Sequence, residues 1–416
     1  DARALIAREL LARPGDLILK AYAAAIALGD TTGPARSEQR RNLEAVLQRM
    51  PESPFVRYHL GRAYMLEGTT KQAIDQFERC VKLDPNYAPG WVALAESELA
   101  RGNPTAAEDR AANVLRRNPG YLPAMLAHAK SQVSRGKSSE AEATLDQIVK
   151  LQPDNTEALF LLGTARLAQG KASQALRIFS DGRALAAADP RWLLAEVEVL
   201  LSQGNLEAAR GRLQQARNAG VQDQNILYRL ATLELEQKNG RNALPILQSL
   251  ATQNPGSLPY RLALAGAMAI AGDHNQAFAL YQQAEKDYPR EALVRLQHAA
   301  LLAERNDRPG AIRKYTEALE LDKDNPLILN NLAWNILQSN GPPDKALEYS
   351  LQARRVFGRS PEIDDTLAAA YIRLGMHRNA EAIYEEMLSY LPGAEQARVK
   401  NSLERLRSQS NGKKQS

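Results

Sequence analysis

The sequence predicts an all-α protein in which helical hairpins repeat along the chain, and two observations support this prediction. Alanine and leucine are abundant, whereas aromatic residues make up only 6% of the 416 residues, a bias that favours helices over sheets. Small residues and prolines also return at a fixed interval, the one that separates Ala73 from Ala107. Such a period is typical of one repeat array rather than of two or three unrelated domains.

The clearest part of the repeat is a ladder of ten alanines, with one additional residue before the last two. They are Ala73, Ala107, Ala141, Ala175, Ala209, Ala243, Ala277, Ala311, Ala346 and Ala380. Prolines mark another position, where one helix must end and the next begin. They are Pro51, Pro85, Pro119, Pro153, Pro255, Pro289 and Pro392. The additional residue falls in residues 338–344, whose Asn-Gly-Pro-Pro run is turn chemistry that can absorb it.

Residues 54–87 illustrate what one repeat contains. An apolar-periodic run, Phe55–Leu66, is followed by a short turn and by a second run, Lys71–Leu83. Gly61 and Ala73 are small enough to let the two helices approach closely. Because one hairpin cannot bury its apolar face alone, we expect neighbouring hairpins to stack and to share a continuous core.

The repeat resembles the tetratricopeptide repeat, which is about 34 residues long, in residue types as well as in length. Its fullest copy contains Leu60, Gly61, Tyr64, Ala73, Phe77 and Pro85. The resemblance covers residues 20–394 and implies a right-handed superhelical solenoid of about eleven helix-turn-helix repeats. We expect the repeats to start near residues 20, 54, 88, 122, 156, 190, 224, 258, 292, 327 and 361.

The two ends of the chain depart from the repeat. Residues 1–19 resemble the second helix of a truncated upstream repeat, and the first residue is Asp1 rather than Met, so we expect the natural protein to continue upstream. Residues 395–407 predict a polar C-terminal capping helix. Residues 408–416 are predicted to form a disordered basic tail.

The family resemblance also implies where a ligand would lie, because the first helices of successive tetratricopeptide repeats line the concave face. The matching positions here are Tyr58, Arg62, Met65, Val92, Glu96, Leu99, Leu126, Lys130, Phe160, Leu194, Tyr228, Asn331 and Trp334. Most of these side chains are apolar, which suits an amphipathic helix or an extended apolar segment of a partner protein. The alternative is that many of them, Trp334 included, only pack against the neighbouring repeat or loop.

The charges on that face alternate in sign through Arg62, Glu96 and Lys130. Pairing with a ligand would explain the alternation, but a solvated face with local ion pairs is the interpretation we favour. His128, Glu196 and His298 stand at positions that normally hold apolar residues. We expect both histidines to be hydrogen-bonded core residues and not ligands of a metal.

The sequence offers no catalytic, cofactor or metal site. It has no nucleophile elbow, no phosphate-binding loop and no zinc motif, and Cys80 is its only cysteine. The formal net charge is +5, but from Glu395 onward there are six basic residues against two acidic ones, so the body is nearly neutral. Such a body disfavours nucleic-acid binding. No apolar window is long enough to predict a membrane span.

We therefore expect a non-enzymatic scaffold that binds a protein or peptide along an apolar concave groove. Residues 330–334, Asn-Asn-Leu-Ala-Trp, and residues 365–367, Asp-Thr-Leu, resemble bacterial repeat proteins of exopolysaccharide export and exosortase systems. That resemblance implies a place in the periplasm or envelope rather than the cytoplasm. Two alternatives stay open: a polysaccharide-contacting module of an export complex, and the regulatory region of a larger enzyme whose catalytic domain lies outside these residues.

Overall fold

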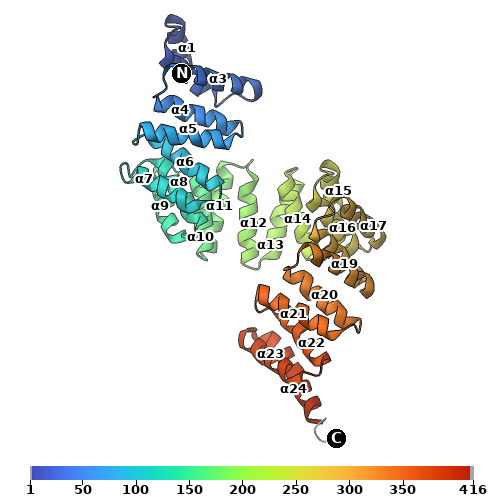
Figure 1. Cartoon of the computed structure of the whole chain (residues 1–416). Coiled ribbons are helices and arrows are strands. Elements are labelled where there is room, and N and C mark those ends of the chain that lie inside the picture. Colours follow the sequence, from blue (N-terminus) through green and yellow to red (C-terminus); the bar gives the residue numbers. More distant parts are fainter. Residues whose placement is uncertain (1, 413–416) are drawn as a thin grey trace. The chain divides into compact units, whose positions relative to one another are not determined.

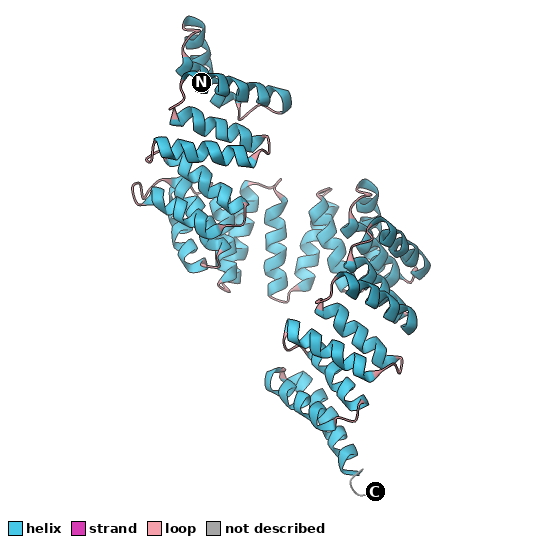
Figure 2. Cartoon of the chain, viewed as in Figure 1, coloured by secondary structure: helices cyan, strands magenta, loops and turns pink. Residues whose placement is uncertain are grey.

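The structure is a computed structural model that describes the backbone of residues 2–412 and the side chains of residues 2–408. Within these residues every regular element is a helix, as Figure 2 shows. The helices are α1 (Ala2–Ala12), α2 (Leu17–Ala27), α3 (Gly33–Arg49), α4 (Pro54–Leu66), α5 (Thr70–Leu83), α6 (Ala88–Ala100), α7 (Pro104–Leu115), α8 (Leu122–Ser134), α9 (Ser138–Leu151), α10 (Thr156–Ala168), α11 (Ala172–Leu185), α12 (Pro190–Ser202), α13 (Leu206–Asn218), α14 (Gln224–Glu236), α15 (Gly240–Gln253), α16 (Leu258–Ala271), α17 (His274–Asp287), α18 (Ala292–Glu304), α19 (Arg308–Leu321), α20 (Pro326–Gln338), α21 (Pro343–Phe357), α22 (Pro361–Arg373), α23 (His377–Tyr390) and α24 (Gly393–Gly412). The prediction of an all-α helical repeat solenoid is confirmed.

The helix bounds follow the repeat of the sequence closely. From α4 to α20 the even-numbered helices begin at a constant interval, and α22 begins one residue later than that interval predicts. The second helix of the α20–α21 hairpin also begins one residue late, so the additional residue lies in the turn before Pro343. The chain divides into two compact units, Asp1–Arg212 and Leu213–Ser416. Within each unit, helices that are neighbours in sequence pack side by side (Figure 1).

Each hairpin from α4 to α23 turns through one residue with a left-handed backbone. These residues are Gly68, Gly102, Gly136, Gly170, Gly204, Lys238, Gly272, Asn306, Asn340 and Gly375. In the first of these turns, the Gly68 amide donates to the Met65 carbonyl (3.1 Å), and the Thr69 amide donates to the Tyr64 carbonyl (2.9 Å). These bonds satisfy carbonyls at the end of α4 that the helix leaves unpaired, and they help to reverse the chain within a short turn.

The core depends on close approach between the two helices of a hairpin. An added Cβ at Gly61 of α4 would lie 2.5 Å from Cε1 of Phe77 in α5, and Gly163 of α10 stands in the same relation to Phe179 of α11. The Phe77 and Phe179 side chains are almost completely buried. An alanine at Gly61 or Gly163 would therefore force the facing phenylalanine ring to shift.

The first repeat differs from the predicted boundaries because its caps shift it. The Asp16 carboxylate accepts hydrogen bonds from the Ile18 and Leu19 amides (3.0 and 3.1 Å), so α2 begins at Leu17 and not near residue 20. A polar stretch such as residues 29–37 favours a long turn in the sequence. Instead α3 already begins at Gly33, because the proline after it favours the first turn of a helix.

The C-terminal helix is longer than predicted. Helix α24 extends from Gly393 to Gly412, beyond the expected range 395–407, so the prediction of disorder is wrong for residues 408–412. No proline or glycine interrupts this segment before its last residue, and the helix therefore continues. Residues 413–416 of the predicted tail lie outside the described residues.

Candidate functional site

A hollow of about 440 Å³ opens between the first helices of three successive repeats in the unit Asp1–Arg212. We call it the α4–α8 groove. Its lining residues are Tyr58, Arg62, Met65, Leu66, Phe77, Pro89, Val92, Ala93, Glu96, Tyr121 and Pro123. Five residues of the predicted binding set, Tyr58, Arg62, Met65, Val92 and Glu96, thus meet in one cavity.

Helix geometry explains why these side chains converge. Tyr58, Arg62 and Met65 are spaced by four and three residues in α4 and therefore share one face of that helix. The opposite face of α4 carries the buried Val56 and Leu60, which belong to the hydrophobic core. That burial fixes the rotation of α4 about its axis, so the face with Tyr58 points away from this cluster. Tyr58 and Met65 are partly buried there, at the edge of a second cluster that includes Phe77.

Aromatic rings surround Tyr58, and of these Phe77 also lines the groove. The Tyr58 ring centroid lies 6.0 Å from that of Phe77, 5.6 Å from that of Tyr87 and 4.9 Å from that of His59. Burial raises the pKa of Tyr58, so its phenol is neutral at physiological pH. Burial, helped by the nearby Arg62 cation, lowers the pKa of His59 to about 4. At neutral pH the His59 ring is therefore uncharged.

Arg62 and Glu96 supply the charge in the groove. An Nη1 atom of Arg62 lies 3.4 Å from Nδ1 of His59, and the guanidinium stands 6.0 Å from the centroid of the Tyr58 ring. Glu96 is exposed. Within the described part of the chain, neither Arg62 nor Glu96 forms an ion pair. Each therefore has its full charge available to a ligand.

The remaining predicted residues of this unit lie outside the groove. The side chains of Leu99 and Leu126 are partly buried and pack against core residues. The Phe160 ring packs against Trp192 with centroids 5.3 Å apart, and the Lys130 ammonium pairs with the Glu157 carboxylate at 3.3 Å. The last predicted residue of this unit, Leu194, is half-buried in α12.

In the unit Leu213–Ser416 the predicted residues are also separate from one another. The Tyr228 ring lies 5.1 Å from that of Tyr260. The carbonyl of Asn331 accepts a hydrogen bond from the Asn335 side chain (2.8 Å), while Trp334 on the same helix is 41% exposed. The structure thus brings together only the N-terminal members of the predicted set.

Sequence reasoning missed Tyr121 as a groove residue. Tyr121 immediately precedes α8, at the N-cap position, and therefore lies outside the first-helix positions that the family resemblance indicated. Tyr87 stands at the same place before α6. Tyr87 and Tyr121 thus occupy the same position of successive repeats in the sequence. This recurrence could have indicated that aromatic rings lie together at the starts of these first helices.

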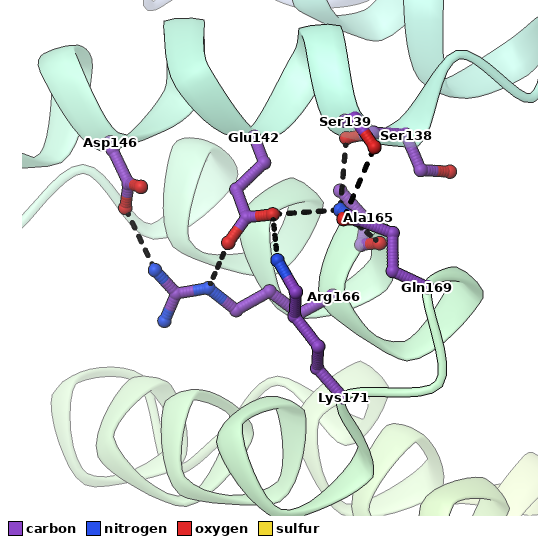
Figure 3. A network of polar contacts seen from close by, with 8 residues as sticks. All are labelled: Ser138, Ser139, Glu142, Asp146, Ala165, Arg166, Gln169 and Lys171. Carbon is purple, nitrogen blue, oxygen red and sulfur yellow. Dashed lines mark hydrogen bonds and ion pairs between the residues drawn. The ribbon is translucent and has the colours of Figure 1, made fainter.

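A network of polar contacts links α9 to the repeat that follows it (Figure 3). The Glu142 carboxylate of α9 accepts hydrogen bonds from Lys171 (2.6 Å), Gln169 (2.8 Å) and Arg166 (3.0 Å) of the next repeat. The bond from Lys171, followed by those from Gln169 and Arg166, lowers the pKa of Glu142 to about 2. Glu108, one repeat earlier, is held by Lys137 (3.0 Å) in the same way. These carboxylates join successive repeats and leave no charge for a ligand.

The polar residues at apolar repeat positions are mostly paired inside the protein. Glu196 is fully buried and accepts a hydrogen bond from Arg183 (2.8 Å). Nδ1 of His298 lies 2.7 Å from the Glu285 carboxylate, as expected for a hydrogen-bonded core histidine. Nδ1 of His128 is buried without a hydrogen-bond partner, so the same expectation is wrong for that atom.

The described side chains show no arrangement suited to metal or nucleophilic chemistry. Among them, no three His, Cys, Asp or Glu residues are grouped as metal ligands would be. Cys80 is buried, and burial raises its pKa to about 12, so its thiol stays protonated. None of the helices in residues 2–412 combines the length and apolar character that crossing a membrane requires.

Comparisons with known proteins agree with this architecture. Models of the tetratricopeptide repeat match residues 54–97, 98–165, 135–197 and 194–257. The chain is 33% identical over 61 residues to a TPR repeat-containing protein of Pseudomonas aeruginosa. That match spans 15% of this chain and 58% of the relative.

Solved structures resemble the chain at low sequence identity. Yeast Tom70 superposes with a TM-score of 0.55 at 12% identity, over 95% of this chain and 97% of that one. A tetratricopeptide repeat protein from Parabacteroides merdae gives a TM-score of 0.48 at 15% identity, over 68% of this chain and 98% of that one. The helical hairpins and the family matches, which together span residues 54–257, identify tetratricopeptide repeats in this chain.

Proposed function

We propose that the protein is a non-enzymatic scaffold that holds an extended segment of a partner protein in the α4–α8 groove. One observation carries the proposal: first-helix side chains of successive repeats line a single cavity of about 440 Å³. A cavity of this size accommodates a few side chains rather than a folded domain. The partner would therefore be recognised through a short peptide segment.

Apolar burial would supply most of the binding free energy. Met65, Val92 and Tyr121 present apolar surface to the cavity. Removing such surface from water contributes roughly 25 cal/mol per Å², against the cost of ordering the peptide. The wall itself costs little to order, because Val92 belongs to the packed core behind the groove and the helices are already formed.

A narrower hypothesis places this scaffold in a bacterial envelope assembly such as an exopolysaccharide export complex. It depends on the resemblance of residues 330–334 and 365–367 to proteins of those systems. Identification of the partner tests it directly, because a partner without any role in the envelope would contradict the placement.

The groove is tested by selecting peptides from a random phage-displayed library on the whole protein. We expect the wild type to enrich a family of related peptides. For a synthetic peptide of that family, the double variant Tyr58→Ala, Met65→Ala is expected to lose at least tenfold in affinity, about 1.4 kcal/mol. Circular dichroism and thermal melting establish that the variant is folded.

Leu151 provides the matched control, because it is 65% exposed in α9 and lies outside the groove. Leu151→Ala should bind the selected peptide as the wild type does. The proposal is wrong if the wild type enriches no peptide family, or if the groove variant retains full affinity. Enrichment of an oligosaccharide instead, in a glycan array, would favour the polysaccharide-contacting alternative.

A further inference from the structure

The charges of the groove distinguish it from the rest of the first-helix face. Arg62 and Glu96 occupy the same position of two successive repeats and have opposite signs. Both line the cavity, and neither forms an ion pair in the described part of the chain. A hollow with apolar walls thus presents one cation and one anion side by side.

Neighbouring charges do not share this property. Lys130 occupies the equivalent position of the next repeat, but its ammonium pairs with Glu157 (3.3 Å), which also lies 3.4 Å from Arg191. Local ion pairing explains Lys130 without a ligand. It does not explain Arg62 and Glu96, which have no ion-pair partner among the described residues, although Glu96 is solvent-exposed as a solvated face requires.

The local structure also prepares Arg62 for an anion. Its guanidinium is placed beside the Tyr58 ring and the His59 ring nitrogen, contacts that restrict the side chain without neutralising it. The planar guanidinium has five N–H donors, and most of them remain available to a carboxylate, which it can bind in a bidentate manner.

We infer that the groove selects a peptide with an acidic side chain opposite Arg62, a basic side chain opposite Glu96, and a large apolar side chain between them that enters the cavity. The inference rests on the proposed function and specifies the chemistry of its ligand. Packed helices lie roughly 10 Å apart. An extended chain covers that distance in about three residues, so the acidic and the basic side chain should be at least three residues apart.

For a peptide bound in a given direction, the two charges fix the order of its acidic and basic residues. The acidic residue lies over α4 and the basic residue over α6. A peptide with the two charges exchanged would bring like charges together at both positions if it bound in the same direction. Among peptides that bind in that direction, the groove would therefore distinguish sequences of the same composition by the order of their charges.

The test repeats the peptide selection on charge variants of the whole protein. The wild type is expected to enrich acid–apolar–base peptides. Arg62→Glu should replace the acidic preference with a basic one, and Glu96→Arg should make the opposite change at the second position. The double variant Arg62→Glu, Glu96→Arg should prefer the inverted order. For synthetic peptides of both orders, we expect each preference to be about tenfold and to weaken as salt rises.

Lys130→Glu is the control, because Lys130 is already paired within the protein. It should leave the selected motif unchanged. Melting curves establish that each variant is folded. If Arg62→Glu does not fold, Arg62→Gln, which removes the charge without reversing it, takes its place. If the enriched peptides are apolar and show no charge preference, or if the variants do not change the preference, this inference is wrong. The proposal that the groove binds a peptide would still hold. Failure of the wild type to enrich any peptide would overturn both.

Discussion

Lys238 is the least suitable residue among the ten left-handed turn positions. Its φ is 59°, whereas seven of the other turns use glycine, and Asn306 and Asn340 complete the set. A side chain in this region costs roughly 1–2 kcal/mol, less for asparagine than for lysine. Glycine avoids that cost but loses more conformational freedom on folding.

We therefore expect Lys238→Gly to raise the free energy of unfolding by about 1 kcal/mol. Lys238 is exposed, so its removal breaks no packing. Urea denaturation of the wild type and the variant measures the change. Lys238→Ala is the control: it removes the same charge but keeps a Cβ, and should gain little. An equal gain for both variants would mean that the charge, and not the backbone, is the cause.

The groove was predictable from the sequence only in part, for reasons that are visible at individual residues. Spacing by three and four places Tyr58, Arg62 and Met65 on one face, and sequence alone supplies that. It does not show that Lys130 finds Glu157 while Glu96 finds no partner among the described residues, because ion pairing depends on side-chain positions between repeats. The unequal availability of the charges became visible only in the structure.

At the scale of the helical hairpin, two glycines with different surroundings allow a matched test. Gly163 in α10 faces the buried ring of Phe179, whereas Gly211 in α13 has no atom close to the position of an added Cβ. Gly163→Ala should lower the free energy of unfolding by about 1–3 kcal/mol, because the added methyl forces the buried ring to shift within a packed core.

Gly211→Ala should instead raise stability by up to about 1 kcal/mol, since alanine is the better helix former and the site is open. Thermal or urea unfolding of the two variants measures both effects. Loss of stability in both would indicate that glycine matters to these helices for a reason other than close packing.

The helix bounds were predictable wherever the repeat is regular. The prediction of the bounds failed where local signals compete with the repeat. The starts of α4 and α6 follow from the repeat register and from prolines in the first turn. The start of α2 is set by the Asp16 cap, and the length of α24 by the lack of an early helix breaker. These are local effects that the period of the repeat does not encode.

At the scale of the whole molecule, stability should be a local property, because helices pack mainly against their neighbours in sequence. In the Gly163→Ala variant we expect faster amide hydrogen exchange in α9–α12 and unchanged exchange in α18–α23. Exchange followed by mass spectrometry, peptide by peptide, measures this. A uniform increase along the chain would contradict independent repeats and would indicate that the protein unfolds in a single cooperative step.

Packing between neighbours also has a kinetic consequence. A hairpin such as α4–α5 needs only a short turn to bring its helices into contact, so folding does not depend on closing long loops. Proteins with such short-range contacts fold fast for their size. During synthesis, each hairpin could dock on the one before it as soon as it emerges, and the apolar face of the newest repeat would be exposed only until the next one arrives.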